Sequence, residues 1–442
     1  MGIMPVGRLL TVMSLPAMTS MLVQALYNIV DSVFVSRISE NALTAVTLVF
    51  PVQMLMISVA VGGGVGLSSL IARKLGERKN DEANDAATHG YFIAIICWLT
   101  FAAFGLFGVE FFVRAFSDNE DITSKAVIFC RIVTTGSAFL FIQVTSERIL
   151  QATGNTILPM VFNMTGALTN ITLNPILIFG LFGAPRMGIA GSATATLIAQ
   201  CTAASIATLM IFRLKHDVKI KFKGFRVKKK ILGGIYSVGL PAIVMQAIMS
   251  VTLLGFNAIL IKMTSTAVAV MGLYFRIQSL IFMPTFGLIQ GALPIMGYNY
   301  GARKKVRLMD CYKKAIIAAM SIMALGLAVF QIFPANILQL YDATPDMMRL
   351  GIRALRIISL CFIPAGFVNV TTTLFQALGH GVISMVMTII RQLALILPAA
   401  WVLAHFFGVD FVWCAFPLSD YTCVFVVSYL VYRVYNKDIK NL

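Results

Sequence analysis

The feature that most constrains this chain is its series of long apolar runs. Most of them exceed the roughly 20 residues that a helix needs to cross the hydrocarbon core of a bilayer. Only 12% of the residues are charged and 59% are hydrophobic, whereas soluble domains contain about 25% charged residues. Apolar runs of this length with few charges indicate membrane-spanning helices. The sequence therefore predicts an all-α integral membrane protein.

Twelve apolar runs follow one another with short polar loops between them. We expect membrane-spanning helices at residues 9–36, 43–71, 87–113, 126–147, 157–182, 188–212, 235–261, 267–297, 312–334, 351–376, 381–407 and 411–432. The first run is long enough to span and lacks the features of a cleaved signal, so we expect it to remain as the first helix. No segment between the runs is long enough to form a separate domain.

The basic residues are concentrated in particular loops. The net charge of +17 would suggest nucleic acid binding in a soluble protein, but here the loop "RLKHDVKIKFKGFRVKKK" follows the sixth run and "ARKKVRLMDCYKK" follows the eighth. Loops rich in Lys and Arg lie on the cytoplasmic side of a membrane. This places both termini in the cytoplasm and predicts no nucleic acid partner. Contact of these loops with anionic lipid would add to that topology.

The second half of the chain repeats the first at an offset of 225 residues. This offset aligns Gln53 with Gln278, Gly76 with Gly301, and "LQATG" at 150–154 with "FQALG" at 375–379. The repeated unit contains six helices, and because six is even both copies cross the membrane in the same sense. We therefore expect two six-helix bundles, 1–212 and 235–442, which are joined by a basic linker at 213–234. A pseudo-two-fold axis along the membrane normal relates them.

Two bundles related in this way are typical of secondary transporters, in which one half rocks against the other and opens a central cavity to each side in turn. Pro16 and Pro241 occupy equivalent places in the first helix of each half, and we expect both helices to bend there. The simpler interpretation is that duplication only enlarged a bundle.

Polar residues form stripes on four helices of the first half. Ser20, Gln24, Tyr27, Asn28 and Asp31 share one face of the first helix. The fourth, fifth and sixth helices carry Gln143, Glu147 and Gln151; Asn163, Asn170 and Asn174; and Ser192, Thr196 and Gln200. Stripes on four helices predict a wet cavity. For its substrate-facing wall we select Gln24, Tyr27, Gln143, Glu147, Asn163 and Gln200, with Gln246 and Gln278 from the second half.

Asp31 is the strongest candidate for a functional charge. A carboxylate within a membrane helix costs about 2.5 to 3.5 kcal/mol on insertion scales and is functional by default. It can bind a proton or hold Na⁺, and the competing interpretation is an interfacial pair with Arg37. Glu147 is either functional or part of a surface ion pair with its neighbour Arg148.

In the second half, we expect Asp420 to be neutralised by Arg276 and Arg391.

Several stretches resemble one known family over essentially the whole chain. They are "YNIVDSVFVSRISENALTAVTLVFPVQ" (27–53), "ERILQATGN" (147–155), "TNITLNPILIFG" (169–180), "GIAGSATATLIAQ" (188–200), "RIQSLIFMPTFGLIQGALPIMGYNYGARKKVR" (276–307) and "FQALGHG" (375–381). They are similar to the multidrug and toxic compound extrusion (MATE) family, and within it to the MepA-like bacterial branch. The resemblance implies the MATE fold in a bacterial cytoplasmic membrane.

The resemblance also implies a cation site in the first half. The family's helix 1 aspartate falls on Asp31, its helix 5 asparagine on Asn170 and its helix 6 threonine on Thr196, and we add Asn28 and Asn174 to the coupling site. Many relatives read "NIxLDP" where this chain reads "NITLNP", so Asn174 replaces an expected carboxylate. Either Asp31 carries the coupling charge alone, or Glu147 substitutes, or coupling is weakened.

The function that the resemblance implies is secondary antiport: export of amphipathic, often cationic compounds in exchange for H⁺ or Na⁺. The sequence lacks the ATP-binding motif GxxxxGK[ST], and we expect no further cofactor and a monomer. The alternative is a flippase for lipids or lipid-linked precursors. An intramembrane prenyltransferase would need paired aspartates for Mg²⁺, and we interpret "DNED" at 118–121 as a solvated helix cap instead. We therefore predict no enzymatic activity.

Overall fold

The computed structural model describes residues 1–36, 38–214, 217–341 and 343–442, and for residues 28, 29, 31–33, 35, 36 and 40 it describes the helical backbone alone. All regular secondary structure in these ranges is helical, as predicted.

The first half contains α1 (Val6–Ser36), α2 (Glu40–Gly76), α3 (Asn80–Ala103) with η1 (Phe104–Gly108) and α4 (Val109–Arg114), α5 (Glu120–Thr135), α6 (Ala138–Ala152), α7 (Ile157–Phe179), η2 (Leu181–Gly183) and α8 (Ile189–Arg213).

The second half contains α9 (Lys229–Ile261), α10 (Ser265–Gly301), α11 (Lys305–Ile332), α12 (Pro334–Gln339), α13 (Pro345–Ser359), α14 (Phe362–Leu378), α15 (Gly381–Ile389), η3 (Ile390–Ile396), α16 (Leu397–Phe407), η4 (Val412–Cys414), α17 (Ala415–Val434) and η5 (Tyr435–Ile439).

These helices make the predicted crossings. Within the described ranges, nine helices are long and apolar enough to cross a membrane, and the pairs α5 with α6 and α13 with α14, bent by 43° and 44°, each supply one more. The remaining crossing is α7, which is less apolar because it carries Asn163, Asn170 and Asn174 and which packs between α1 and α8. The all-α fold with twelve crossings in two bundles is confirmed.

The helix ends differ from the apolar runs by up to a few turns. α2 begins at Glu40 because the Ser39 side chain accepts a hydrogen bond from the backbone N–H of Ala42 and caps the helix. α9 begins at Lys229, inside the stretch predicted as linker. Pro16 and Pro241 lie within α1 and α9, which are each continuous helices, so the bends at these positions stay predictions.

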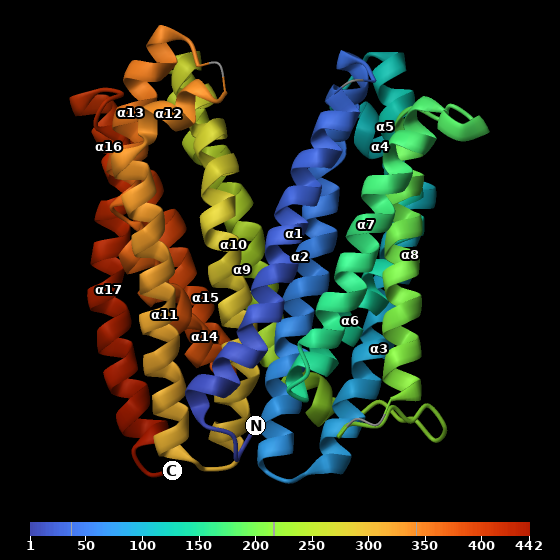
Figure 1. The fold of residues 1–442 in the computed structure, drawn as a ribbon, viewed down its shortest axis with the longest axis vertical. Helices are drawn as coiled ribbons and strands as arrows, with labels where there is room; N and C mark the ends of the chain where they lie inside the picture. Colours follow the sequence, from blue (N-terminus) through green and yellow to red (C-terminus); the bar gives the residue numbers. More distant parts are fainter. Residues whose placement is uncertain (37, 215–216, 342) are drawn as a thin grey trace.

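The two bundles stand side by side with both termini at the same end (Figure 1). They lie close together at this end and diverge towards the end that carries α5 and α12. α1 packs against α10, and α2 packs against α9 and α10. These helices form the seam between the halves.

Glycines let the helices of the seam approach closely, in two symmetry-related pairs of contacts. A Cβ atom built on Gly62 of α2 would lie 2.5 Å from the backbone nitrogen of Ile243 on α9, and a Cβ on Gly287 of α10 would lie 2.5 Å from that of Met18 on α1. The second pair is Gly66 and Gly291, where a Cβ would lie 2.6 Å from Gly239 N and 2.6 Å from Ser14 Oγ. Each residue is displaced from its counterpart by the same 225 residues, so the internal repeat extends to the contact surface. Small residues are how membrane helices pack tightly.

Polar contacts close the seam near the termini. Ser69 Oγ on α2 donates a hydrogen bond to the carbonyl of Gln376 on α14 at 2.6 Å, and Arg73 Nη1 donates to the carbonyl of Leu378 at 3.4 Å. The two halves are therefore hydrogen-bonded to each other at the end where they lie close together.

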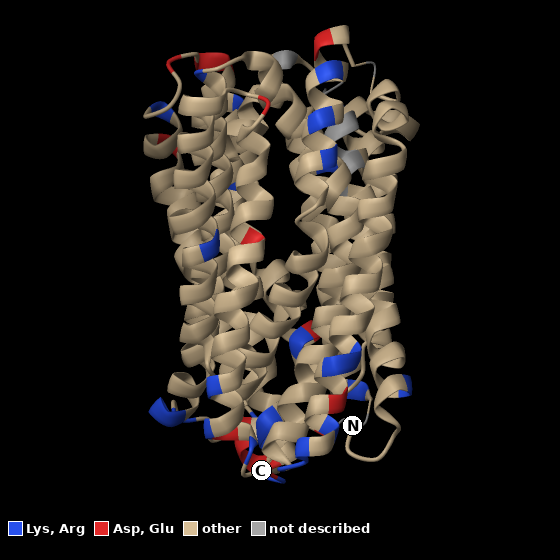
Figure 2. Ribbon diagram, turned by 90° about the vertical axis from the view of Figure 1, so that its left-hand side faces the viewer, with Lys and Arg blue, Asp and Glu red and all other residues tan. Residues whose placement is uncertain are grey.

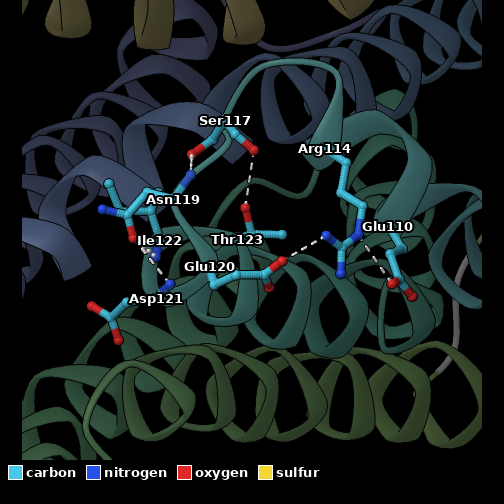
Figure 3. Close-up of polar contacts among 8 residues, drawn as sticks. All are labelled: Glu110, Arg114, Ser117, Asn119, Glu120, Asp121, Ile122 and Thr123. Atoms are coloured by element: carbon cyan, nitrogen blue, oxygen red, sulfur yellow. Dashed lines mark hydrogen bonds and ion pairs between the residues drawn. The ribbon is translucent and has the colours of Figure 1, made fainter.

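Charged residues gather at the two ends of the molecule and leave a long, nearly uncharged middle (Figure 2). At the end away from the termini, the turn between α4 and α5 is held by local contacts (Figure 3). Asn119 Oδ1 accepts hydrogen bonds from the backbone N–H groups of Asp121 and Ile122, and Glu120 pairs with Arg114 at 2.9 Å. The interpretation of residues 118–121 as a helix cap is confirmed.

Candidate functional site

The first cluster of candidate residues lies between α7 and α8. Asn170 Nδ2 donates a hydrogen bond to Thr196 Oγ1 at 3.2 Å, and Asn170 is only 2% exposed. The helices approach each other here because Gly166 sits against the backbone carbonyl of Ala199. The structure thus brings together two of the predicted cation-site residues, and Asn174 lies buried one turn further along α7.

The acceptor oxygen of Asn170 is available for a ligand. Among the described residues Oδ1 of Asn170 has no hydrogen-bond partner, although it is buried. A buried carbonyl oxygen without a partner costs about 1 to 3 kcal/mol. A bound cation or water would relieve that cost.

Asp31 and Asn28 lie on α1, which packs against α7, but their side chains are outside the part of the chain that the structure describes. Three residues beyond Asp31, the ring of Phe34 is 6.5 Å from the ring of Phe179 at the end of α7. The turn of α1 that carries Asp31 therefore runs beside the last turns of α7, which ends at Phe179. The composition of the full cation site stays a prediction.

The second cluster surrounds Glu147 on α6. Glu147 is 7% exposed, and its carboxylate accepts hydrogen bonds from Gln151 Nε2 at 2.8 Å and from Asn163 Nδ2 at 3.3 Å. Gln143 Nε2 in turn donates to Asn163 Oδ1 at 2.8 Å. Three of the predicted cavity residues are therefore members of one buried network.

The interpretation of Glu147 as part of a surface ion pair with Arg148 is wrong, because both residues are buried. Arg148 is 4% exposed and its Nη1 donates to Gln151 Oε1 at 3.1 Å, so Gln151 bridges the two charges. Two amide groups donate hydrogen bonds to the carboxylate, and no described residue forms an ion pair with it. An ionisable residue inside a membrane bundle is by default a candidate for function.

The network continues into the second half through a residue that the sequence analysis missed. Gln151 Nε2 also donates to Gln290 Oε1 on α10 at 3.1 Å. Gln290 stands between Gly287 and Gly291, the two seam glycines of α10. The available signal was a glutamine in the apolar stretch between Phe286 and Met296 of α10, but its partner could not be inferred from the sequence.

The remaining predicted cavity residues lie on α1, α8, α9 and α10, and none of them is fully buried. Gln24 on α1 and Gln246 on α9 have exposed side chains, and Tyr27, Gln200 and Gln278 are half-buried. A common cavity lined by all of them stays a prediction.

The buried charges of the second half neutralise each other, as predicted for Asp420 and Arg391. Arg391 forms an ion pair with Asp420, which is 1% exposed, and its Nη1 donates to Asn369 Oδ1 at 3.1 Å. Arg391 lies on the π-helical segment η3, and its carbonyl accepts a hydrogen bond from Ser419 at 2.8 Å. Arg276 has an exposed side chain and is not a partner of Asp420 among the described residues.

Comparison with known proteins gives matches over nearly the whole chain. The model of the MatE family matches residues 16–176 and 241–402, one segment in each half. The chain is 24% identical to the multidrug export protein MepA of Staphylococcus haemolyticus, over 96% of this chain and 93% of that protein. It is also 24% identical to an FAD transporter of Shewanella oneidensis, over 97% of this chain and 95% of that protein.

The fold matches solved structures equally well. An outward-facing structure of a multidrug resistance MATE family transporter of the MOP superfamily aligns with a TM-score of 0.93 and 28% identity, and the alignment covers 99% of this chain and 97% of the other.

Proposed function

Since the chain belongs to the MatE family of membrane transporters, we propose that it is a secondary active multidrug efflux antiporter, which exports amphipathic, cationic organic compounds in exchange for H⁺ or Na⁺. The observation that carries the proposal is the pair of buried polar clusters in the first half, around Asn170 and around Glu147. Burying such polar clusters in a membrane bundle costs desolvation free energy, and stripes of this kind mark ion and substrate pathways.

The coupling ion binds in the first half, at Asp31 with Asn28, Asn170, Asn174 and Thr196. The buried Oδ1 of Asn170, which has no hydrogen-bond partner among the described residues, supports this site, because hydroxyl, amide and carboxylate oxygens can together replace the water around a small cation. A proton would bind the Asp31 carboxylate itself. Asn174 supplies an oxygen ligand but cannot accept a proton, so in this scheme Asp31 carries the charge of the site.

Glu147 links ion binding to the movement of the halves. Its hydrogen-bond chain runs through Gln151 to Gln290 on the opposite side of the seam. When the halves separate at this end, the bond from Gln151 to Gln290 must break, and Glu147 gains access to water. The carboxylate is therefore shielded in one conformation and open to solvent in the other, as alternating access requires.

The cytoplasm borders the end that carries the termini, where the basic loops lie (Figure 2). A single chain supplies both halves of the seam, so the functional unit is a monomer in a bacterial cytoplasmic membrane, and it is a transporter without enzymatic activity.

The substrate class follows from charge. In this scheme Asp31 adds a carboxylate to the first half, where Arg148 already lies in the same buried network as Glu147, while Arg391 of the second half is paired with Asp420. An organic cation fits this arrangement better than an anion. The FAD transporter is as similar to this chain as the multidrug exporter is, so FAD belongs among the substrates tested.

The experiment is transport in proteoliposomes that contain wild type or Asn170→Leu. Three substrates are compared, the fluorescent cation ethidium, FAD and a labelled phospholipid, each with no gradient, a pH gradient or a Na⁺ gradient. We expect wild type to move ethidium only when one ion gradient is imposed, and Asn170→Leu to lose most of that dependence. Movement of the lipid without any gradient would instead identify a flippase.

A further inference from the structure

A groove on the outer surface of the first half lies between α6 and α8. Its volume is about 380 Å³, and it is lined by Phe139, Ile142, Ala204, Ser205, Thr208, Leu209, Phe212 and Arg213. Leu209 and Phe212 are 59% and 53% exposed, so the groove opens away from the bundle. All but one of its lining residues are uncharged, and the exception, Arg213, is the last residue of α8.

The linker brings two more basic residues close to the end of the groove at Arg213. The ring of Phe212 lies 6.5 Å from the ring of Phe222 in the linker, and Lys221 and Lys223 flank Phe222 in the chain. The linker is fixed in place because the backbone N–H of Lys221 donates to Thr88 Oγ1 on α3 at 3.2 Å. Arg213, Lys221 and Lys223 are exposed, and none of the three forms an ion pair with a described residue.

We propose that this groove is a binding site for an anionic phospholipid. One acyl chain lies along α6 and α8, and the phosphate lies at the level of Arg213, Lys221 and Lys223. Arg213 ends the apolar span of α8, which is the depth at which lipid headgroups lie, and basic residues there attract anionic headgroups. A soluble anion would leave the apolar lining of the groove uncovered. A phospholipid matches both the apolar lining, through its acyl chain, and the basic end, through its phosphate.

The site is well placed to influence transport. α6 carries Glu147 and Gln151 on its buried side, and Phe139, at the start of the helix, follows the 43° bend between α5 and α6. A chain bound between α6 and α8 would brace the helix that holds the buried network. The binding itself does not depend on the proposed transport function, so it is tested separately.

The test is native mass spectrometry of the purified protein with phosphatidylglycerol or phosphatidylcholine of identical acyl chains. Wild type is expected to retain phosphatidylglycerol in preference to phosphatidylcholine. Arg213→Gln should lower the apparent affinity for phosphatidylglycerol about 5-fold, the factor expected for one basic residue at an anionic surface. Thr208→Phe, which fills the groove, should lower the retention of both lipids at this site.

Matched controls separate the groove from general effects. Arg433→Gln removes a basic residue from the last turn of α17 in the second half, and Thr194→Phe adds the same ring to α8 at a position 14 residues before Thr208, about 21 Å away along the helix. Both controls should bind phosphatidylglycerol as wild type does. Equal retention of the two lipids by wild type, or wild-type binding by Arg213→Gln and Thr208→Phe, would overturn the proposal.

Discussion

The close approach of α2 and α9 at Gly62 makes a sharp prediction about the seam between the halves. In Gly62→Ala the new methyl group would lie 2.5 Å from the backbone nitrogen of Ile243 and 2.7 Å from its Cα. Ordinary contacts are 3.4 to 4 Å, and backbone atoms cannot rotate away. The two helices must therefore separate by about 1 Å, and the seam cannot close fully.

The expected cost can be compared with overpacked cores, where an inserted methyl group costs about 1 to 3 kcal/mol. Alanine favours the helix over glycine by about 1 kcal/mol, so the net loss should be between about 0 and 2 kcal/mol. Gly63→Ala is the matched control, because a Cβ at Gly63 meets no atom within 4 Å. That variant should be as stable as wild type, or more stable by up to about 1 kcal/mol.

The assay is thermal unfolding in detergent together with transport in proteoliposomes. Gly62→Ala should melt below Gly63→Ala and turn over more slowly, and the symmetry-related Gly287→Ala should behave in the same way because its Cβ meets Met18 at the same distance of 2.5 Å. If Gly62→Ala and Gly63→Ala had the same melting temperature and the same rate, the seam would not depend on the glycines.

Two further variants test the buried polar groups. Asp420→Asn should destabilise the second half by about 3 to 5 kcal/mol, because it leaves the buried Arg391 without its counter-charge. The double variant Arg391→Met with Asp420→Leu should recover much of that loss in thermal unfolding. An unchanged melting temperature in Asp420→Asn would contradict the role of the pair. Gln290→Leu should shift the equilibrium between the closed and open seam roughly 2- to 10-fold towards the open state, as expected for one lost hydrogen bond of about 0.5 to 1.5 kcal/mol. Spin labels across the seam would measure the shift, Gln246→Leu serves as the control, and identical distance distributions would remove Gln290 from the seam.

The number and class of elements could be predicted from the sequence, because in a bilayer the length of an apolar run dictates a helix. The repeat could also be predicted, since identical residues such as Gly76 and Gly301 recur at one constant offset along the chain. The ends of helices were less accessible, because they depend on local caps such as Ser39 and on loops that add turns outside the apolar run.

The family resemblance, and not the helix pattern alone, singled out Asn170 and Thr196 among the polar residues of α7 and α8. The structure places these two side chains in contact, and their role in cation binding stays a prediction. The partner of Gln151 was not predictable, because contacts between helices depend on packing angles that a single sequence does not specify. The same reason explains Glu147, whose position near the end of an apolar run indicated the surface although its side chain is buried against Asn163 of α7 and Gln151 of its own helix.

Ion-driven transport by wild type and Asp31→Asn tests most directly whether this protein is an antiporter coupled through Asp31. Both proteins are reconstituted in liposomes, and ethidium movement is followed under an imposed pH gradient and then under a Na⁺ gradient. The amount of protein in the liposomes and the thermal stability of the two proteins are matched. We expect one of the two gradients to drive transport by wild type. Asp31→Asn keeps the shape of the side chain but loses its charge, so it should no longer respond to that gradient. Transport by Asp31→Asn with the wild-type response to the gradient would contradict the assignment of Asp31 as the residue that carries the coupling charge.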